Sequence, residues 1–182
     1  RRSAQSAQLA KLEHIRAAGD HLLSLINDVL DLSGLEAGEV RLSMQPVDVA
    51  QLVRKSLPLL QSLATQHGVL LEIGAAEGIA HGDQTRLRQV LINLVSNAIK
   101  YNRAGGRVVV EAQTVQGEEV TLSVRDTGRG LSAEQIASLF EPFNRFGAES
   151  EGIEGTGIGL TIVKALVDGM AGRIEVESNL GR

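Results

Sequence analysis

Four short blocks that combine asparagine, aspartate, phenylalanine and glycine follow one another in this chain. They are NLVSNAIKY from Asn93, DTGRG from Asp126, FEPFNRF from Phe140 and GTGIGL from Gly155. Each block alone fits ordinary structure, because a lone glycine run is usually a turn and a lone Asn on a helix is usually a cap or a solvated residue. Their order and spacing favour one nucleotide site, and the sequence lacks the glycine, lysine and hydroxyl pattern of a P-loop.

The first block puts two carboxamides and a cation on neighbouring turns of a predicted helix. Asn93 and Asn97 are four residues apart and share one face, and Lys100 lies one position off that line on the next turn. Magnesium prefers oxygen ligands and shares its shell with phosphates and water, so a single Asn can serve as its protein ligand. Lys100 would supply a point charge to phosphate, and Tyr101 could lie against adenine or ribose. Asn93 also fits a hydrogen bond within the domain, whereas for Asn97 we favour the functional role.

The second block places a carboxylate where a predicted strand ends. Gly128 and Gly130 follow Asp126 and would let the backbone approach a flat ring without side-chain obstruction. A buried carboxylate there could accept a hydrogen bond from an adenine amino group, because an ionised Asp offers acceptors only. Alone, the pentapeptide would be an ordinary Asp-Thr-Gly turn, and only its place between the other blocks favours the nucleotide role.

The third block spaces Phe140, Phe143 and Phe146 three residues apart beside the segment GAESEGIEG, which has no apolar periodicity. A small hydrophobic anchor that pins a loop is one interpretation. Such an anchor would also let a mobile lid close over nucleotide and meet another helix. Arg145 could reach a phosphate, but an exposed surface position fits equally well.

The fourth block precedes an apolar helical pattern. Gly155, Gly157 and Gly159 can bring backbone N–H groups and the positive end of a helix to phosphates. The same string fits close helix packing, so by itself it is a weak signal.

In this order the blocks match the N, G1, F and G2 boxes of sensor histidine kinases, and the chain resembles the ATP-binding module of that family, within the GHKL superfamily, over nearly its whole length. The resemblance implies ATP and Mg2+ as cofactors, with Asn97 as the metal ligand and Asn97 and Lys100 as the catalytic residues. The nucleotide contacts that it implies are Asn93, Asn97, Lys100, Tyr101, Asp126, Gly128, Gly130, Arg145, Thr156, Gly157, Ile158, Gly159 and Leu160.

The resemblance also implies transfer of the γ-phosphate to a histidine and onward to a response regulator receiver domain. An in-line imidazole is needed for that step. The family's acceptor motif, His-Glu-x-x-x-Pro, does not occur in this sequence. We interpret His14, His21, His67 and His81 as structural or surface residues, so the acceptor is expected on an absent helix of the same protein or its dimer mate.

The elements that position these blocks begin with a long predicted helix. Its apolar residues recur three and four apart, at Ile15, Ala18, Leu22, Leu25, Val29 and Leu32. One amphipathic helix cannot bury such a stripe alone, so we expect a homodimer in the intact protein. By the resemblance, residues 1–38 are the second helix of a dimerisation and histidine-phosphotransfer hairpin, and residues 39–182 are the ATP-binding catalytic domain.

The rest of the chain predicts an α+β fold, a two-layer α/β sandwich in which a mixed sheet carries helices on one face, and the resemblance implies the same fold, of the Bergerat type. Asp83 caps a helix that runs to about Tyr101, and Pro58 kinks an earlier helix. The predicted elements are a short strand before Val49, helix 49–66, strand 69–73, the capped helix, a hairpin around Gly117, helices 133–139 and 157–170, and a strand RIEVES from Arg173. The family's last strand is expected to be truncated.

Composition narrows the remaining possibilities. The formal net charge of −4 provides no broad basic field for nucleic acid, and the chain has no cysteine and no close metal-ligand spacing among its four His. No apolar run reaches the length of a membrane span. We expect a cytoplasmic piece without membrane contact, whose parent protein could still be membrane-anchored.

Two alternatives stay open. One is a catalytically silent nucleotide-binding scaffold that signals by rearrangement of its bundle. The other is a GHKL-type ATPase related to chaperone, topoisomerase or mismatch-repair ATPases, in which ATP closes a dimer. The bundle helix directly before the module and the short lid favour the kinase.

Overall fold

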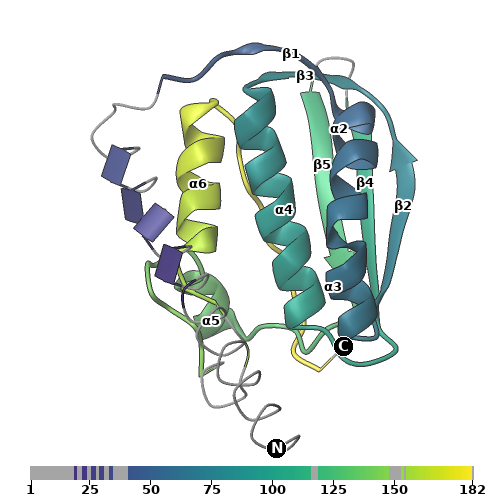
Figure 1. Cartoon of the computed structure of the whole chain (residues 1–182), viewed down its shortest axis with the longest axis vertical. Helices are drawn as coiled ribbons and strands as arrows, with labels where there is room; N and C mark the ends of the chain where they lie inside the picture. Colours follow the sequence, from purple (N-terminus) through teal and green to yellow (C-terminus); the bar gives the residue numbers. More distant parts are fainter. Residues whose placement is uncertain are drawn as a thin grey trace, which may run out of the picture.

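The computed structural model describes residues 41–115, 119–147, 153 and 155–181, together with residues 19, 22, 23, 26, 27, 29, 30, 33 and 34. Figure 1 shows how the described elements are arranged. In chain order they are β1 (Gln45–Asp48), α2 (Val49–Ser56), the 3-10 helix η1 (Leu57–Leu60), α3 (Gln61–Gln66), β2 (Leu70–Ala76), β3 (Ile79–Gly82), α4 (Gln84–Lys100), β4 (Arg107–Val115), β5 (Glu119–Asp126), α5 (Ala133–Ala137) and α6 (Gly159–Gly169).

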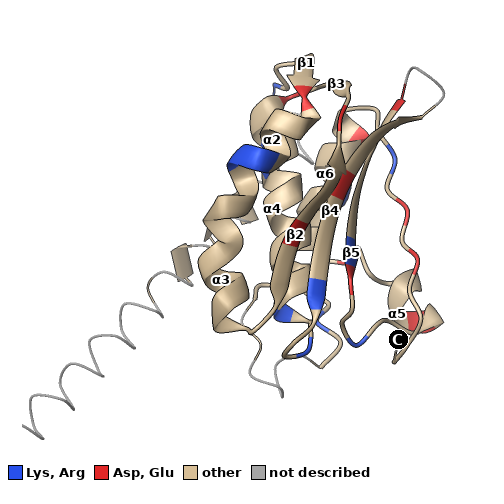
Figure 2. Cartoon of the chain, turned by 90° about the vertical axis from the view of Figure 1, so that its right-hand side faces the viewer, with Lys and Arg blue, Asp and Glu red and all other residues tan. Residues whose placement is uncertain are grey.

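The sheet is mixed and helices cover one of its faces, which confirms the predicted two-layer α/β sandwich. Its strand order is β2-β4-β5, with β2 parallel and β5 antiparallel to β4. Helices α2, α4 and α6 lie side by side on one face (Figure 1). The strands carry charged residues (Figure 2), among them the ion pairs of Arg107 with Glu72 and of Arg125 with Glu111. Strands β1 and β3 form a separate antiparallel pair.

Helix α4 belongs to two hydrophobic clusters, so both of its flanks are buried. Toward the sheet and α2, its residues Leu91, Val95 and Ile99 are fully buried with side chains from β4 and α2. Toward α6, Val90 packs with Ile158, Ile162, Val163 and Leu166. This double burial fixes the rotation of α4 about its axis, and therefore the direction in which its polar residues point.

The kink predicted at Pro58 is confirmed. The helical segment divides there into α2, η1 and α3, because proline lacks an N–H donor and its ring collides with the preceding turn. The η1 turn still buries Leu57 and Leu60 in the core.

Three sequence predictions differ from the structure. Strand β3 was not predicted, because IAHG is too short and too poor in β-branched residues to stand out. RIEVES was predicted as a strand, yet residues 173–178 belong to no strand. This segment contacts β5 through an ion pair in which the Arg173 Nη2 lies 3.3 Å from the Glu119 Oε2. Helix α6 begins at Gly159 and not at Gly157, since the positive φ of Gly157 (74°) is not helical.

The predicted bundle helix falls mostly outside the described residues. Those that are described there are helical, and their large apolar side chains are 46–64% exposed; they are Leu22, Leu23, Ile26, Val29 and Leu30. In the part of the chain that the structure covers, no helix combines the length and the apolar character that crossing a bilayer would need.

Asp83 joins the segment before β1 to the start of α4. Its Oδ1 accepts hydrogen bonds from the backbone N–H groups of Thr85 (2.9 Å) and Arg86 (3.1 Å), which confirms the predicted N-cap. Its Oδ2 accepts from the Ser43 N–H at 2.9 Å. The Ser43 bond is the main reason why the pKa of Asp83 lies below its ordinary value of 3.8, and it outweighs the opposing effect of burial.

We expect Asp83→Ala to lower the free energy of unfolding by about 1–2 kcal/mol at neutral pH, because the cap is lost. Asp83→Asn should cost less, since Asn is a good N-cap. Because the folded-state pKa is depressed, the stabilisation by charge is complete above about pH 4 and is lost as the pH falls through the folded pKa. Urea unfolding across this range measures both effects.

The matched control is Asp48→Ala, which removes the N-cap of α2, a hydrogen bond to the Gln51 N–H, without any link to Ser43. An advantage of the wild-type protein over Asp83→Asn that persists unchanged at about pH 2 would contradict the role of the charge.

Candidate nucleotide site

Helix α4 carries the residues of the first block to the end of the molecule where α6 begins (Figure 1). Asn93, Asn97 and Lys100 are all half-buried on it. The Asn93 Nδ2 donates to the Gly159 carbonyl at 3.4 Å, so this carboxamide links α4 to the first residue of α6. That is the intradomain hydrogen bond considered from the sequence. The Asn97 carboxamide takes part in none of the hydrogen bonds found within the described ranges, which leaves its oxygen available for a cation.

Asp126 is the last residue of β5, as predicted, but its side chain is exposed and not buried. Its Oδ1 accepts a hydrogen bond from the Gly128 N–H at 2.8 Å, which closes a short Asx turn at the strand end. The exposure follows from this position, because the strand register places Asp126 opposite Val108, near the start of β4 and at the rim of the sheet. One carboxylate oxygen is thus engaged with the loop, and the other remains accessible.

The glycines of the second block are required by contacts within the protein. A Cβ on Gly128 would lie 2.7 Å from the Tyr101 carbonyl oxygen, so this loop packs directly on the end of α4. Gly130 has a φ of +71°, and a Cβ there would come within 2.2 Å of the Asn179 carbonyl. These contacts fix the loop against both α4 and the segment that follows α6. Close approach of the glycine backbone to a flat ring stays a prediction.

A cavity of about 320 Å³ opens beside the end of α4. This volume is within the usual range for small-molecule sites. Within it, the Arg129 guanidinium lies 5.0 Å from the ring centroid of Tyr101, a cation–π distance. The lining residues are Lys100, Tyr101, Asn102, Arg103, Gly128, Arg129, Ile153 and Gly181.

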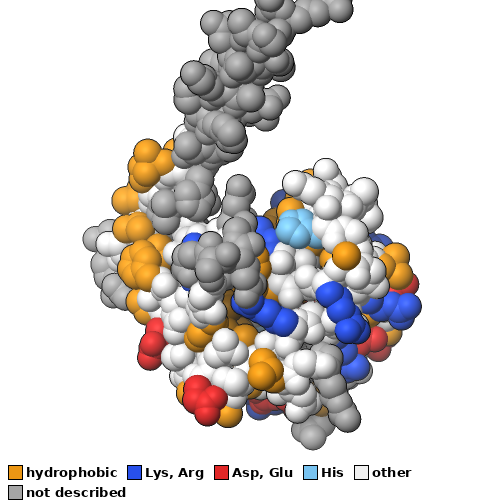
Figure 3. Space-filling model, turned by 90° about the horizontal axis from the view of Figure 1, so that it is seen from below, with side chains coloured by type: hydrophobic (Ala, Val, Ile, Leu, Met, Phe, Trp, Pro, Cys, Tyr) orange, Lys and Arg blue, Asp and Glu red, His pale blue; other side chains and the backbone are white. Residues whose placement is uncertain are grey.

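Of the residues around this cavity, Lys100, Tyr101 and Gly128 were predicted from the sequence, whereas Arg129 and Ile153 were not. Arg129 lies between the two glycines of DTGRG, and only its stacking on Tyr101 in the structure identifies it. Figure 3, a view of the end where α4 finishes, shows that Lys and Arg side chains gather there. The local field therefore favours anions although the whole chain is acidic.

The third and fourth blocks contact each other through backbone atoms. The Phe143 N–H donates to the Gly157 carbonyl at 3.0 Å, and a Cβ on Gly157 would lie 2.9 Å from Phe143 backbone atoms. Arg145 donates through Nη2 to the Ile153 carbonyl, and Ile153 also lines the cavity. Arg145 is half-buried, so the alternative of an exposed surface arginine is wrong.

The phenylalanine spacing does not produce a uniform anchor. Phe140 and Phe146 are half-buried, whereas Phe143 is 64% exposed. Phe143 and Phe146 both have positive φ angles, 63° and 50°, which side-chain-bearing residues rarely adopt. Such strain persists only where surrounding contacts enforce it, and it concentrates at functional sites.

The start of α6 presents backbone more than side chains. Ile158 is fully buried in the cluster with α4, so a nucleotide could meet only its backbone. The Thr156 hydroxyl accepts from the Ile158 N–H at 3.2 Å, and among the described residues the N-cap residue Ile158 forms no side-chain cap bond to the first turn of the helix. Uncapped N–H groups at a helix start are suited to anions. Gly159 and Leu160 are half-buried in this turn.

The four blocks therefore adjoin one another in space. Asn93 touches Gly159, Tyr101 touches Gly128, and Phe143 touches Gly157. Among the described residues, no group of three or more His, Cys, Asp or Glu could hold a metal ion by itself.

Comparison with known proteins shows the family of the chain. A family model described as histidine kinase-, DNA gyrase B- and HSP90-like ATPase matches residues 82–182. The sensor protein GacS of Pseudomonas syringae pv. syringae is 38% identical over 183 residues, which cover 96% of this chain and 20% of GacS. Histidine protein kinase DivJ of Caulobacter vibrioides is 37% identical over 177 residues, 96% of this chain and 29% of DivJ.

The chain thus spans less than a third of the length of either relative. Among solved structures, full-length ShkA in complex with AMPPNP superposes with a TM-score of 0.82 at 35% identity, over 95% of this chain and 36% of ShkA. The family match covers more than half of the chain. The chain therefore belongs to the histidine kinase-, DNA gyrase B- and HSP90-like ATPase family and is an ATP-binding catalytic domain of the sensor histidine kinase type.

Proposed function

We propose that this domain binds Mg-ATP where α4 ends and α6 begins, and transfers the γ-phosphate to a protein histidine outside the present sequence. The observation that carries the proposal is the convergence of the four blocks, through Asn93 with Gly159, Tyr101 with Gly128, and Phe143 with Gly157. Phosphoryl transfer depends mainly on positioning and on offsetting negative charge, and this end of the molecule supplies both.

The metal part of the proposal rests on Asn97. Its carboxamide oxygen is a hard ligand on a rigid helix and takes part in none of the hydrogen bonds of the described residues. A bound magnesium ion would offset charge on the transferred phosphoryl group. Lys100, one turn further along, would hold phosphate oxygens by its charge.

The proposed contacts to the base and to the phosphates lie on two different segments, the loop after β5 and the start of α6. Asp126 would accept from the adenine amino group with the carboxylate oxygen that Gly128 does not use. The backbone from Thr156 to Leu160 and the uncapped first turn of α6 would receive the phosphates. Adenine could contact only the face of Tyr101 that Arg129 leaves open, unless Arg129 moves.

The wider assignments belong to the same proposal. Residues 1–38 would form the second helix of the dimerisation hairpin and residues 39–182 the catalytic domain. The exposed apolar side chains at positions 22, 23, 26, 29 and 30 call for partner helices, as in a homodimer. The acceptor histidine would lie on such a helix, a response regulator receiver domain would take the phosphate onward, and the site of action would be the cytoplasm, where ATP is available.

Calorimetric titration with a non-hydrolysable ATP analogue, with and without magnesium, tests the nucleotide site. We expect saturable binding that magnesium strengthens. A folded chain that binds nothing would overturn the proposal and favour the scaffold alternative.

Asp126→Asn should raise the Kd for the analogue by at least about tenfold, because the amide loses the charge and one acceptor oxygen. The fold should be unchanged, since the residue is exposed. Asp48→Asn is the matched control, because it changes an exposed capping Asp on another part of the molecule. Equal affinity of the Asp126 variant and the control would remove Asp126 from the site.

Asn97→Asp should change the magnesium dependence more than the fold. A carboxylate binds magnesium more strongly than a carboxamide but repels the phosphates, so we expect the half-saturating magnesium concentration to shift by at least about threefold. Asn27→Asp, on the preceding helix, gives the same change of charge outside the catalytic domain. Identical magnesium titrations of the two variants would contradict the ligand role.

A further inference from the structure

Among the described residues, strand β2 is the outermost strand of its sheet, with β4 on one side only (Figure 2). The Leu70 N–H donates to the Gly106 carbonyl at 2.8 Å, so the backbone groups of Leu70 point toward β4. Because consecutive residues of a strand point their N–H and C=O groups to opposite sides, those of Leu71 and Ile73 point to the open edge. Outside the sheet ladder, neither residue's backbone joins a hydrogen bond among the described residues.

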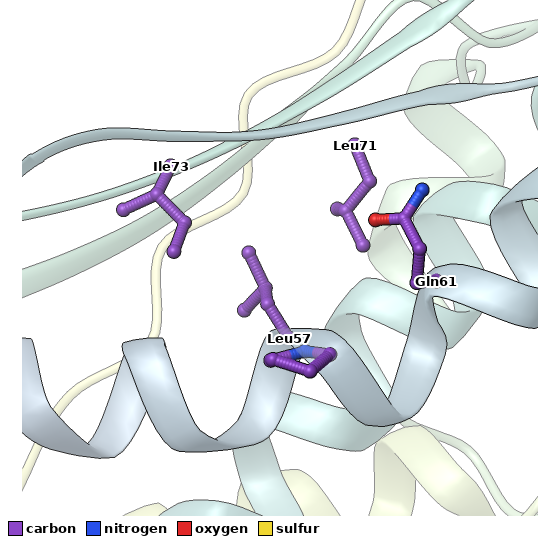
Figure 4. Close-up of a pocket in the computed structure, with 5 residues that line it drawn as sticks. Leu57, Gln61, Leu71 and Ile73 are labelled. Carbon is purple, nitrogen blue, oxygen red and sulfur yellow. The ribbon is translucent and has the colours of Figure 1, made fainter.

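The side chains of these same two residues line an apolar groove. Leu71 and Ile73 point from β2 toward the helical layer, where Leu57 and Gln61 face them across the opening (Figure 4). Pro58 completes the lining, and the groove has a volume of about 440 Å³. Ile73 is 43% exposed, although it is a large aliphatic residue in a regular strand. The same two residues of this short edge thus supply open backbone groups and the wall of an apolar pocket.

The five residues that line the groove are uncharged, and the nearest charge along the chain precedes it on α2. No Asp, Glu, Lys or Arg occurs between Ser56 and Leu71. Arg54 is exposed and stands one helical turn before Pro58, and it forms none of the ion pairs within the described part of the chain. Glu72 points to the opposite face of the sheet, where it pairs with Arg107 at 3.2 Å. The groove therefore has an apolar floor and a basic end.

A second copy of the chain does not fit this surface well. The groove is concave, and an isologous contact would set two concave grooves together with nothing protruding to fill them. The regular part of the edge is also short, because the register of β2 on β4 shifts between Ile73 and Ala76. Such an irregularity limits open-ended sheet extension. The regular part of this edge is long enough to pair with a short peptide.

The geometry points to a docking site for an extended segment of a partner protein. The segment would add a strand to the edge of β2 by hydrogen bonds to Leu71 and Ile73. It would place an aliphatic or aromatic side chain in the groove and an acidic residue against Arg54. The edge and groove consist of residues that the nucleotide site does not use, so partner binding and nucleotide binding can be measured separately.

Fluorescein-labelled hexapeptides of the form Asp-Thr-x-Thr-x-Ser, with Leu, Ile, Val or Phe at both x positions, provide the probe. We expect at least one to bind saturably, with shifts of the Leu71 and Ile73 amide resonances. Ile73→Lys should weaken that binding by at least about tenfold, because it puts a charge in the groove. Leu70→Lys is the matched control, since Leu70 is similarly exposed but points to the other face of β2. Both variants should bind nucleotide normally.

Backbone pairing is tested by N-methylation of the peptide at alternate positions, either at both x residues or at both Thr residues. Strand addition requires one of these patterns to abolish binding and the other to be tolerated. The proposal fails if no hexapeptide shifts Leu71 and Ile73, if Leu70→Lys weakens binding as much as Ile73→Lys, or if both methylated peptides bind equally well. Sedimentation that shows self-association through β2 would overturn it in favour of a second copy.

Discussion

The burial of α4 on two sides is the constraint on which the site depends. One flank is locked into the cluster with the sheet and α2, and the other into the cluster with α6, so the helix cannot rotate without exposing one of them. Its polar residues Asn93, Asn97 and Lys100 are confined to the remaining strip of surface. The cap at Asp83 fixes where the helix begins, and thereby its register against α6. A rigid helix holds the side chains of a site more precisely than a loop would.

The loops around the helix are positioned by backbone contacts that only glycine permits. Gly128 meets the Tyr101 carbonyl at the end of α4, and Gly157 meets Phe143 beside the start of α6. These contacts bring the loops close enough to share one site. The left-handed backbone of Phe143 and Phe146 indicates local strain at these two residues.

Features that depend only on neighbouring residues in the sequence were predictable. The apolar repeat of α4, its cap at Asp83 and the kink at Pro58 need no knowledge of the rest of the fold. Strands were harder to predict from the sequence, because a strand forms only with a partner strand. IAHG pairs with β1 although its residues have low β-propensity. Residues 173–178 alternate apolar and polar side chains but join no sheet ladder. The exposure of Asp126 and the stacking of Arg129 on Tyr101 depend on how distant segments meet, which no local pattern encodes.

Residue-resolved NMR titration with the magnesium complex of a non-hydrolysable ATP analogue shows whether the four separated blocks form one nucleotide site. If they do, amides from all four blocks, at Asn97, Gly128, Arg145 and Gly159, shift together along one binding curve. Shifts confined to a single block, or different apparent Kd values for different blocks, would contradict a single site.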